Sequence, residues 1–451
     1  MKRIIATTLC VVMMFLFSSC GNNDTSQTND TNKRSDEIYF LNFKPEVSEV
    51  YNEIAKDYEK ETGVKVKVVT AASDTYETTL KSEIAKSEAP TIFQINGPVG
   101  YQSWKNYCLD LKDTKLYSYL IDKDMAVSEG EGVYGIPYVI EGYGVIYNGD
   151  IMDKYFNLAE KATDISSVDE INSFEKLKAV VEDMTKNKDK LGINGVFSST
   201  SMSGGETWRW DSHLASVPLY YEMKEKDSQS STNSTAYKAK EIEFKYHNNF
   251  KNLLDLYVNN SVSEKGLLSG KSVNDSMSEF ALGKSAMVQN GNWAWAEIAK
   301  VGGNKVNADN IGYLPLYMDI EGEENQGICI GTENYLAINS KVSKEKQQAS
   351  IAFLEWLFSS ETGKKYVTEK LEFITPFNTF DADETPEDPL AREVLDWMSR
   401  DVETIEWTFN SFPSQEFKNS FSDAMLEYIQ GTKDWNHVKQ SVIDSWRKER
   451  A

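Results

Sequence analysis

The sequence predicts an α/β fold of two lobes joined by a hinge. Strand-like patterns alternate with amphipathic helical patterns, and 451 residues are enough for two hydrophobic cores. Short strand-like pieces rich in glycine and aromatic residues in the middle of the chain suit a crossover between lobes. We therefore expect each lobe to contain a mostly parallel sheet flanked by helices.

The chain begins with a segment that is typical of export. Two cations precede an apolar run over residues 4–17, and the sequence Ser-Ser-Cys-Gly follows at 18–21. This pattern predicts a secretory signal peptide over residues 1–19, because the apolar run is shorter than the roughly 20 residues of a spanning helix. The ending resembles a bacterial lipoprotein signal, which implies lipidation of Cys20, palmitate included. An ordinary cleaved signal is the alternative.

The segment after Cys20 suits a tether. Residues 21–36 (GNNDTSQTNDTNKRSD) contain no apolar side chain and cannot build a core, so residues 20–36 are predicted to be disordered. Such a linker would hold the folded part on the order of 20 Å from the membrane. We expect an exported protein whose only link to the membrane is the lipid anchor, on the outer face of the bacterial cytoplasmic membrane or elsewhere in the envelope.

Composition excludes several classes of partner. The net charge is −22, and loss of residues 1–19 makes it −24 because two cations and no acids are removed. This charge disfavours nucleic acid and anionic lipid. Cys108 and Cys329 would be the cysteines left in the folded part, and two buried free thiols are favoured over a disulfide. The three histidines are scattered, so we expect no metal and no cofactor.

The first elements follow in β-α-β order. Residues 37–42 form a short strand, and apolar residues at helical spacing over 47–58 predict a helix. Valines alternate with lysines over 64–68, as in a half-exposed strand. A helix over about 76–86 and a buried strand over 91–95 come next. Ligands bind beyond the carboxyl ends of such strands, where the site candidates are Asn42, Glu46, Tyr76 and Asn96.

The crossover consists of residues 134–138 and 141–148. Glu141 in this hinge could reach a ligand, and a hinge salt bridge is the alternative. After a helix over 173–185, a glycine and serine loop at 198–205 leads to an aromatic run. Stacking surfaces beside hydroxyl acceptors suit an oligosaccharide, and core packing is the alternative, for Trp208, Trp210 and Asp211. Arg209 is expected to pair with Asp211 or Glu206, and His213 to be a surface or satisfied core residue.

A combination of motifs resembles a known family. Residues 280–284 (FALGK), 286–290 (AMVQN) and 291–295 (GNWAW) resemble the corresponding stretch of extracellular solute-binding proteins of ABC-type sugar importers, including the maltodextrin-binding proteins. The opening strand and helix, Gly-Ile-Pro-Tyr at 135–138, Gly-Tyr-Leu-Pro at 312–315 and the helix at 349–359 occur in the family's order. The resemblance covers most of residues 37–380, and the region from Pro386 is matched only loosely.

The resemblance implies a two-lobe periplasmic-binding-protein-like fold with discontinuous lobes. The first lobe is expected to hold residues 37–142 and 316–362, and the second 143–315 and 363–451. The family implies a monomeric binding protein, not an enzyme, that delivers its solute to the permease subunits of an ABC importer. We expect the solute to be a neutral oligosaccharide, because aromatic and amide side chains outnumber cations in the candidate loops. Two alternatives stay open: a binding protein for a peptide or polyamine, and an exported glycosidase, which needs two suitably spaced carboxylates.

Family order also supplies site residues. Trp293 follows Asn-Gly-Asn at 290–292 and is expected to stack on a pyranose ring, whereas Trp295 is expected in the core or the lobe interface. Trp397, Trp407 and Trp435 are expected to be core or lobe-packing residues. The remaining ligand candidates are Asn290, Glu333 and Phe377.

Overall fold

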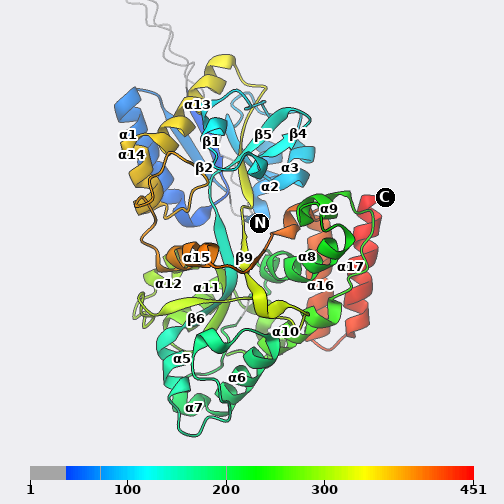
Figure 1. The fold of residues 1–451 in the computed structure, drawn as a ribbon. Coiled ribbons are helices and arrows are strands. Elements are labelled where there is room, and N and C mark those ends of the chain that lie inside the picture. Colours follow the sequence, from blue (N-terminus) through cyan, green and yellow to red (C-terminus); the bar gives the residue numbers. More distant parts are fainter. Residues whose placement is uncertain (1–36, 72, 200) are drawn as a thin grey trace, which may run out of the picture. The chain divides into compact units, whose positions relative to one another are not determined.

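Two β-sheets organise the chain in a computed structural model that describes residues 37–71, 73–199 and 201–451 (Figure 1). The predicted signal peptide, Cys20 and tether lie outside these described residues. Within the described ranges, no helix combines the length and the apolar character needed to cross a membrane.

The first sheet has the strand order β2-β1-β3-β10-β5-β4. β1 pairs in parallel with β2 and β3, and β10 runs antiparallel between β3 and β5. The bounds are β1 (Ile38–Asn42), β2 (Val66–Thr70), β3 (Ile92–Asn96), β4 (Val127–Glu129), β5 (Gly132–Pro137) and β10 (Asn334–Ile338).

The second sheet has the order β11-β9-β6-β7, with β8 also paired to β6. β11 and β9 are parallel, and β6 is antiparallel to each of its partners. The bounds are β6 (Glu141–Asn148), β7 (Met287–Gly291), β8 (Ile311–Leu314), β9 (Gln326–Gly331) and β11 (Glu403–Ile405).

The predicted α/β class with two sheets is confirmed, but the expectation of mostly parallel sheets is wrong in detail. Parallel pairing is found for β1 with β2, β1 with β3, and β9 with β11. Regular β-α-β succession holds only for the first three strands. Later strands enter each sheet from chain segments that return in the opposite direction, so both sheets are mixed.

Helices flank both sheets (Figure 1). Those that pack with the first sheet are α1 (Ser48–Thr62), α2 (Ser73–Glu83), α3 (Gly97–Trp104), α4 (Lys115–Ser118) and α13 (Lys344–Ser359), and the short α14 (Glu361–Lys365) packs against α13. The others are α5 (Gly149–Phe156), α6 (Phe174–Lys186), α7 (Lys188–Leu191), α8 (Ala215–Lys226), α9 (Thr232–Lys238), α10 (His247–Asn259), α11 (Val273–Ala281), α12 (Ala294–Lys300), α15 (Pro389–Ser399), α16 (Gln415–Ile429) and α17 (Trp435–Arg450).

The first helix shows how the sequence pattern produces structure. Its buried side chains include Tyr51, Ile54 and Tyr58, at the spacing that places them on one face. Gly63 ends the helix with φ of 77°, a left-handed conformation that glycine adopts without steric cost. The amphipathic face packs into the core of the first sheet.

The chain changes sheets at residues that differ from the predicted lobe boundaries. Residues 316–331, expected in the first lobe, pack with the second sheet through Leu316, Cys329 and the pairing of β9 with β6. Phe373 and Phe377, expected in the second lobe, belong to the core of the first sheet. Which core these segments join depends on contacts with residues far away in the sequence. The local sequence pattern does not reveal such contacts.

The two cysteines in the described part of the chain are buried and free, as expected. Cys108 packs in a core of the first sheet, and Cys329 lies on β9 in a core of the second. Burial raises the pKa of both thiols, Cys108 to about 12, which keeps them in the unreactive protonated form.

Candidate ligand-binding site

A buried ion pair joins the loop after β1 to the start of β6. Lys44 Nζ donates to Glu141 Oε1 at 2.5 Å and lies 3.7 Å from Glu46 Oε1. The residues Lys44 and Glu141 are only 5% and 3% exposed. Glu141 therefore forms a salt bridge, the alternative to a ligand contact that the sequence left open, and the pair joins the loop after β1 of the first sheet to β6 of the second.

Lys44 stays charged at this position. Burial alone would lower its pKa, but the carboxylates of Glu141, Glu46 and Glu333 outweigh burial and raise it. The ammonium also lies 5.8 Å from the centroid of the Trp293 ring, within reach of a cation–π interaction. This contact connects the ion pair to the main aromatic feature of the site.

Five aromatic rings from distant parts of the chain surround His213. The His213 ring centroid lies 4.5 Å from that of Tyr143, 4.7 Å from Trp208, 5.8 Å from Trp293, 5.0 Å from Trp407 and 4.4 Å from Phe409. These six residues are called the aromatic cluster below. It brings together β6, the π-helical stretch η4 (Arg209–Leu214), the start of α12 and the short helix η8 (Thr408–Ser411).

The predicted candidates Trp293 and Trp208 both belong to the aromatic cluster, with ring centroids 5.9 Å apart. Asp211 lies on η4 at 1% exposure and accepts a hydrogen bond from Ser212 Oγ at 2.6 Å. Burial raises the pKa of Asp211 to about 6, while its hydrogen bond and Lys418 oppose this shift. Aromatic and polar groups therefore converge at η4, and the ligand role of Trp208, Trp293 and Asp211 stays a prediction.

The candidates on the first sheet shape the loop that carries Lys44. Asn42 Nδ2 donates to the Lys44 carbonyl at 2.7 Å, and Asn42 Oδ1 accepts from Lys44 N at 3.1 Å. Asn96 Nδ2 lies 3.5 Å from Glu333 Oε1, and Glu46 lies beside Lys44. These residues gather near the ion pair, where the chain passes between sheets.

Four other candidates make their observed contacts within the protein interior. The hydroxyl of Tyr76 donates to the Leu41 carbonyl at 3.3 Å and accepts from Gln94 N at 2.7 Å. The remaining three are buried as follows: Trp210 packs edge-on against Tyr257, Phe377 packs against Phe358, and the amide of Asn290 contacts Gly291 N and Met277 Sδ.

The structure adds residues that the sequence reasoning did not assign to the site. Trp407 was expected to be a core or lobe-packing residue, and Phe409 was not among the candidates. The rings of both contact the His213 ring. Asn410 Nδ2 donates to the Thr332 carbonyl at 2.8 Å, beside the second crossing between sheets. Gly97, at φ 57°, lies so close that a Cβ there would be 3.1 Å from Asn410 Cβ. The aromatic and amide side chains at 407–410 were the feature of the sequence that could have identified this segment as part of the site.

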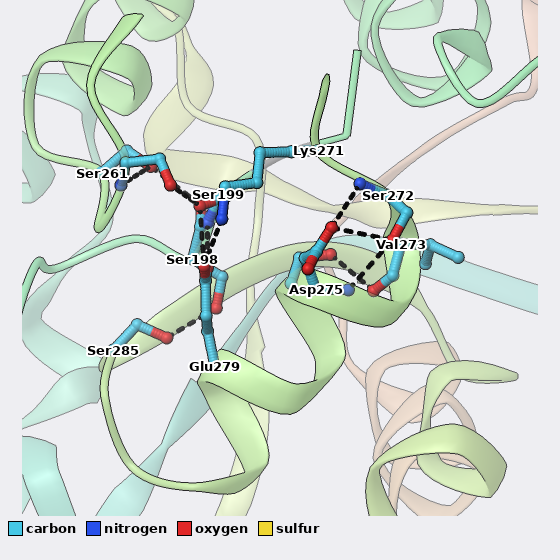
Figure 2. Close-up of polar contacts among 11 residues, drawn as sticks. Ser198, Ser199, Ser261, Lys271, Ser272, Val273, Asp275, Glu279 and Ser285 are labelled. Carbon is cyan, nitrogen blue, oxygen red and sulfur yellow. Dashed lines mark hydrogen bonds and ion pairs between the residues drawn. The ribbon is translucent and has the colours of Figure 1, made fainter. Parts of the chain in front are cut away.

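The loop before Trp208 is fixed by α11, as Figure 2 shows for its serine end. Glu279 on α11 accepts from Ser199 N at 2.7 Å and from Ser199 Oγ at 3.0 Å. Near the other end of the loop, Glu206 accepts from Val273 N at 2.5 Å, at the first turn of α11. Helix α11, which ends in the motif at 280–284, thus holds both ends of the loop and positions Trp208 after it.

The raised pKa of Glu333 is expected to make the free energy of unfolding depend on pH. Burial raises its pKa to about 7, although Lys418 and Lys44 oppose the shift and Glu141 and Glu46 support it. An acid with a raised pKa in the folded state binds its proton more tightly there, so its stabilising contribution is full below about pH 4.5 and is lost as pH rises toward 7. Because the side chain is partly exposed, we expect a loss of about 1 to 2 kcal/mol.

Urea unfolding between pH 4.5 and 7.5 measures this contribution. Glu333→Gln is neutral throughout and is expected to flatten the slope by that amount, while the acids Asp211 and Asp388, whose raised pKa values act in the same direction, leave a residual slope. An unchanged slope in Glu333→Gln would show that the carboxyl titrates normally.

Comparison with known proteins agrees with this architecture. Residues 53–393 match the family model described as bacterial extracellular solute-binding protein. Similar solved structures include a chitin oligosaccharide binding protein (TM-score 0.68, 15% identity, covering 92% of this chain and 99% of that one) and RafE in complex with raffinose (0.67, 18%, 92% and 100%). Maltose-bound MalE3 of T. maritima is also similar (0.66, 14%, 92% and 100%).

No curated protein sequence matches the chain. The structural likeness, at these low identities, concerns the fold, and it confirms the two-lobe class. The family match covers well over half of the chain. This chain is therefore a member of the family of bacterial extracellular solute-binding proteins.

Proposed function

We propose that this protein is the extracellular receptor of an ABC importer and captures a neutral oligosaccharide between its lobes. The aromatic cluster carries the proposal, because the C–H faces of sugar rings pack on aromatic side chains while hydroxyl groups bond to nearby polar groups. Family membership and structural neighbours named for chitin oligosaccharide, raffinose and maltose support the same conclusion.

Charge at the site favours an uncharged ligand. The ammonium of Lys44 is neutralised by Glu141 at 2.5 Å, and the net charge of −22 disfavours an anionic solute. Capture would shift an equilibrium between open and closed arrangements of the lobes, with movement about the crossing segments at 138–140 and 332–333. The closed receptor would then deliver the sugar to the permease.

The proposal includes the N-terminal features predicted from the sequence. Cleavage before Cys20 and its lipidation would hold the receptor at the outer face of the membrane through residues 20–36. Cys20→Ala is expected to release the protein from cell membranes into the medium, with sugar binding unchanged.

The first experiment measures the thermal unfolding midpoint of the purified protein with raffinose, stachyose, maltotriose, chitotriose, tri-alanine and spermidine. A solute at a hundredfold excess over its dissociation constant stabilises the native state by about 2.7 kcal/mol. A shift with a sugar that is recovered intact supports the receptor. A shift only with tri-alanine or spermidine contradicts the oligosaccharide assignment, and recovery of cleaved sugar indicates a glycosidase.

Trp293→Ala is expected to weaken binding of the active sugar about 30-fold. Removal of roughly 100 Å² of aromatic contact costs about 2 kcal/mol of binding free energy. Isothermal titration calorimetry measures the change. Trp295→Ala is the matched control, because Trp295 packs with the core on the other face of the second sheet and should leave the affinity within twofold. Equal loss in both variants would exclude a specific role for Trp293.

A further inference from the structure

The two lobes touch each other through residues that are far apart in the sequence. Gly97, the first residue of α3 in the first lobe, lies against Asn410 on η8 in the second. A Cβ added to Gly97 would lie 3.1 Å from Asn410 Cβ and 3.2 Å from the Asn410 carbonyl oxygen. Gly97 also has a left-handed φ of 57°. Glycine therefore serves both the backbone conformation and the close approach of the lobes.

Both sides of this contact belong to well-packed parts of the structure. On the second lobe, Phe409 N donates to Ser216 Oγ at 3.2 Å, and the side chains of Trp407 and Phe409 are buried in the core. On the first lobe, α3 packs into its own core through Tyr101 and Trp104. Packed elements deform little. A movement of one lobe relative to the other must therefore form or break the contact between α3 and η8.

Lys418 on α16 brings a positive charge to the same interface. Its Nζ lies 5.4 Å from the centroid of the Phe409 ring on η8. On the first lobe, Glu77 of α2 accepts a hydrogen bond from Trp104 Nε1 of α3 at 3.0 Å. Desolvation raises the pKa of three carboxyl groups, and the charge of Lys418 opposes this shift, at Glu77, Asp211 and Glu333. A cation of the second lobe is therefore attracted to a carboxylate of the first lobe and to one in the crossing segment.

We propose that Gly97 and Glu77 of the first lobe and Asn410 and Lys418 of the second form a latch that holds the lobes closed in the absence of ligand. The latch rests on the lobe movement of the proposed function, but not on the identity of the solute. Asn410 and Lys418 lie beyond residues 53–393, the part that matches the family model. The latch slows the entry of a solute, because only molecules with open lobes admit one.

The distance between two spin labels, one on each lobe, tests the latch without any solute. Lys60→Cys on α1 and Asn436→Cys on α17 place labels at exposed positions of the mature protein with Cys20→Ala, and the native Cys108 and Cys329 are buried. Double electron–electron resonance on the sugar-free protein should show mainly the distance expected from the structure. A population mainly at longer distances would overturn the latch.

Gly97→Ala places a methyl group at the contact and should shift the population to longer distances. Gly63→Ala is the matched control, because Gly63 is also a left-handed glycine of the first lobe, with φ of 77°, but a Cβ there would meet no atom within 4 Å. Backbone strain should lower the stability of both variants, whereas only Gly97→Ala should separate the lobes. Equal distance distributions in the two variants would overturn the latch.

Lys418→Gln tests the electrostatic part of the latch. Loss of the charge is expected to lower the ratio of closed to open molecules about two- to fivefold, as for a partly exposed ion pair, and about 1 M NaCl should abolish the difference from the wild type. Lys433→Gln removes the same charge from an exposed position just before α17 and should leave the ratio unchanged. An unchanged ratio in Lys418→Gln at low salt would overturn the latch as proposed.

Solute kinetics separate the latch from the proposed function. The panel sugar with the largest midpoint shift should associate faster with Gly97→Ala and Lys418→Gln than with the wild type, because a larger fraction of these molecules is open. Equal association rates would contradict the latch. Absence of binding by any sugar of the panel would overturn the proposed function, whereas the label distances would still decide the latch.

Discussion

Replacement of Glu141 by alanine is expected to lower the free energy of unfolding by about 3 to 5 kcal/mol. The Glu141 side chain is 3% exposed and accepts from Lys44 Nζ at 2.5 Å. Without it the nearest carboxylate to the buried ammonium is Glu46, at 3.7 Å. Lys44 would keep the cost of its desolvation and lose its main counter-charge. Urea unfolding at pH 7 measures the difference.

Two comparisons identify the cause of this loss. The double variant Lys44→Met with Glu141→Leu should recover most of the stability, because replacing both members of a buried pair by apolar groups is often neutral. Glu160→Ala breaks the ion pair between Glu160 and Lys190, whose side chains are 75% and 50% exposed, and should leave the free energy of unfolding nearly unchanged because water screens an exposed pair. A loss in Glu141→Ala as small as in Glu160→Ala would contradict a desolvated pair.

Features with local causes were predicted well from the sequence. Helical spacing over 47–58 and a glycine at position 63 predicted a helix that the structure has at Ser48–Thr62. Sheet membership was predicted less well, because a strand's partner can lie far away in sequence. β10 pairs with β3 and β5 of the first sheet, whereas β9, which ends three residues earlier, pairs with β6 of the second. No local pattern distinguishes these two apolar strands.

In the candidate site, too, features with local causes could be predicted and those that depend on distant contacts could not. A motif led to Trp293, and an aromatic run led to Trp208, both of which lie in the aromatic cluster. Composition could not separate Trp210 from Trp208, although the first packs against Tyr257 in the core and the second faces His213. The direction of a side chain on η4 depends on the backbone geometry of that stretch and on which element packs opposite it. For the same reason the sequence could not show that five aromatic rings surround His213.

Trp407→Ala is expected to cost about 3 to 5 kcal/mol of stability, as removal of a buried tryptophan does. The residue is 2% exposed, and its ring lies 5.3 Å from Phe409 and 6.3 Å from Trp293, centroid to centroid. Its Cγ is 2.9 Å from where a Cβ on Gly331 would lie, so the glycine at the end of β9 allows this close approach. The cavity would lie beneath the aromatic cluster, and calorimetry should also show a weaker affinity for the bound sugar.

Trp397→Ala separates loss of stability from loss of binding. Trp397 is 8% exposed and packs in the core on the other face of the second sheet, so its removal should also destabilise the protein but leave the sugar affinity unchanged. Both tryptophans lie beyond residues 53–393, the part that matches the family model, but Trp407 belongs to the aromatic cluster and Trp397 lies away from it. A loss of affinity confined to Trp407→Ala would mean that the C-terminal segment helps to select the ligand. Equal affinities in both variants would assign Trp407 to packing alone and leave recognition to the matched part of the chain.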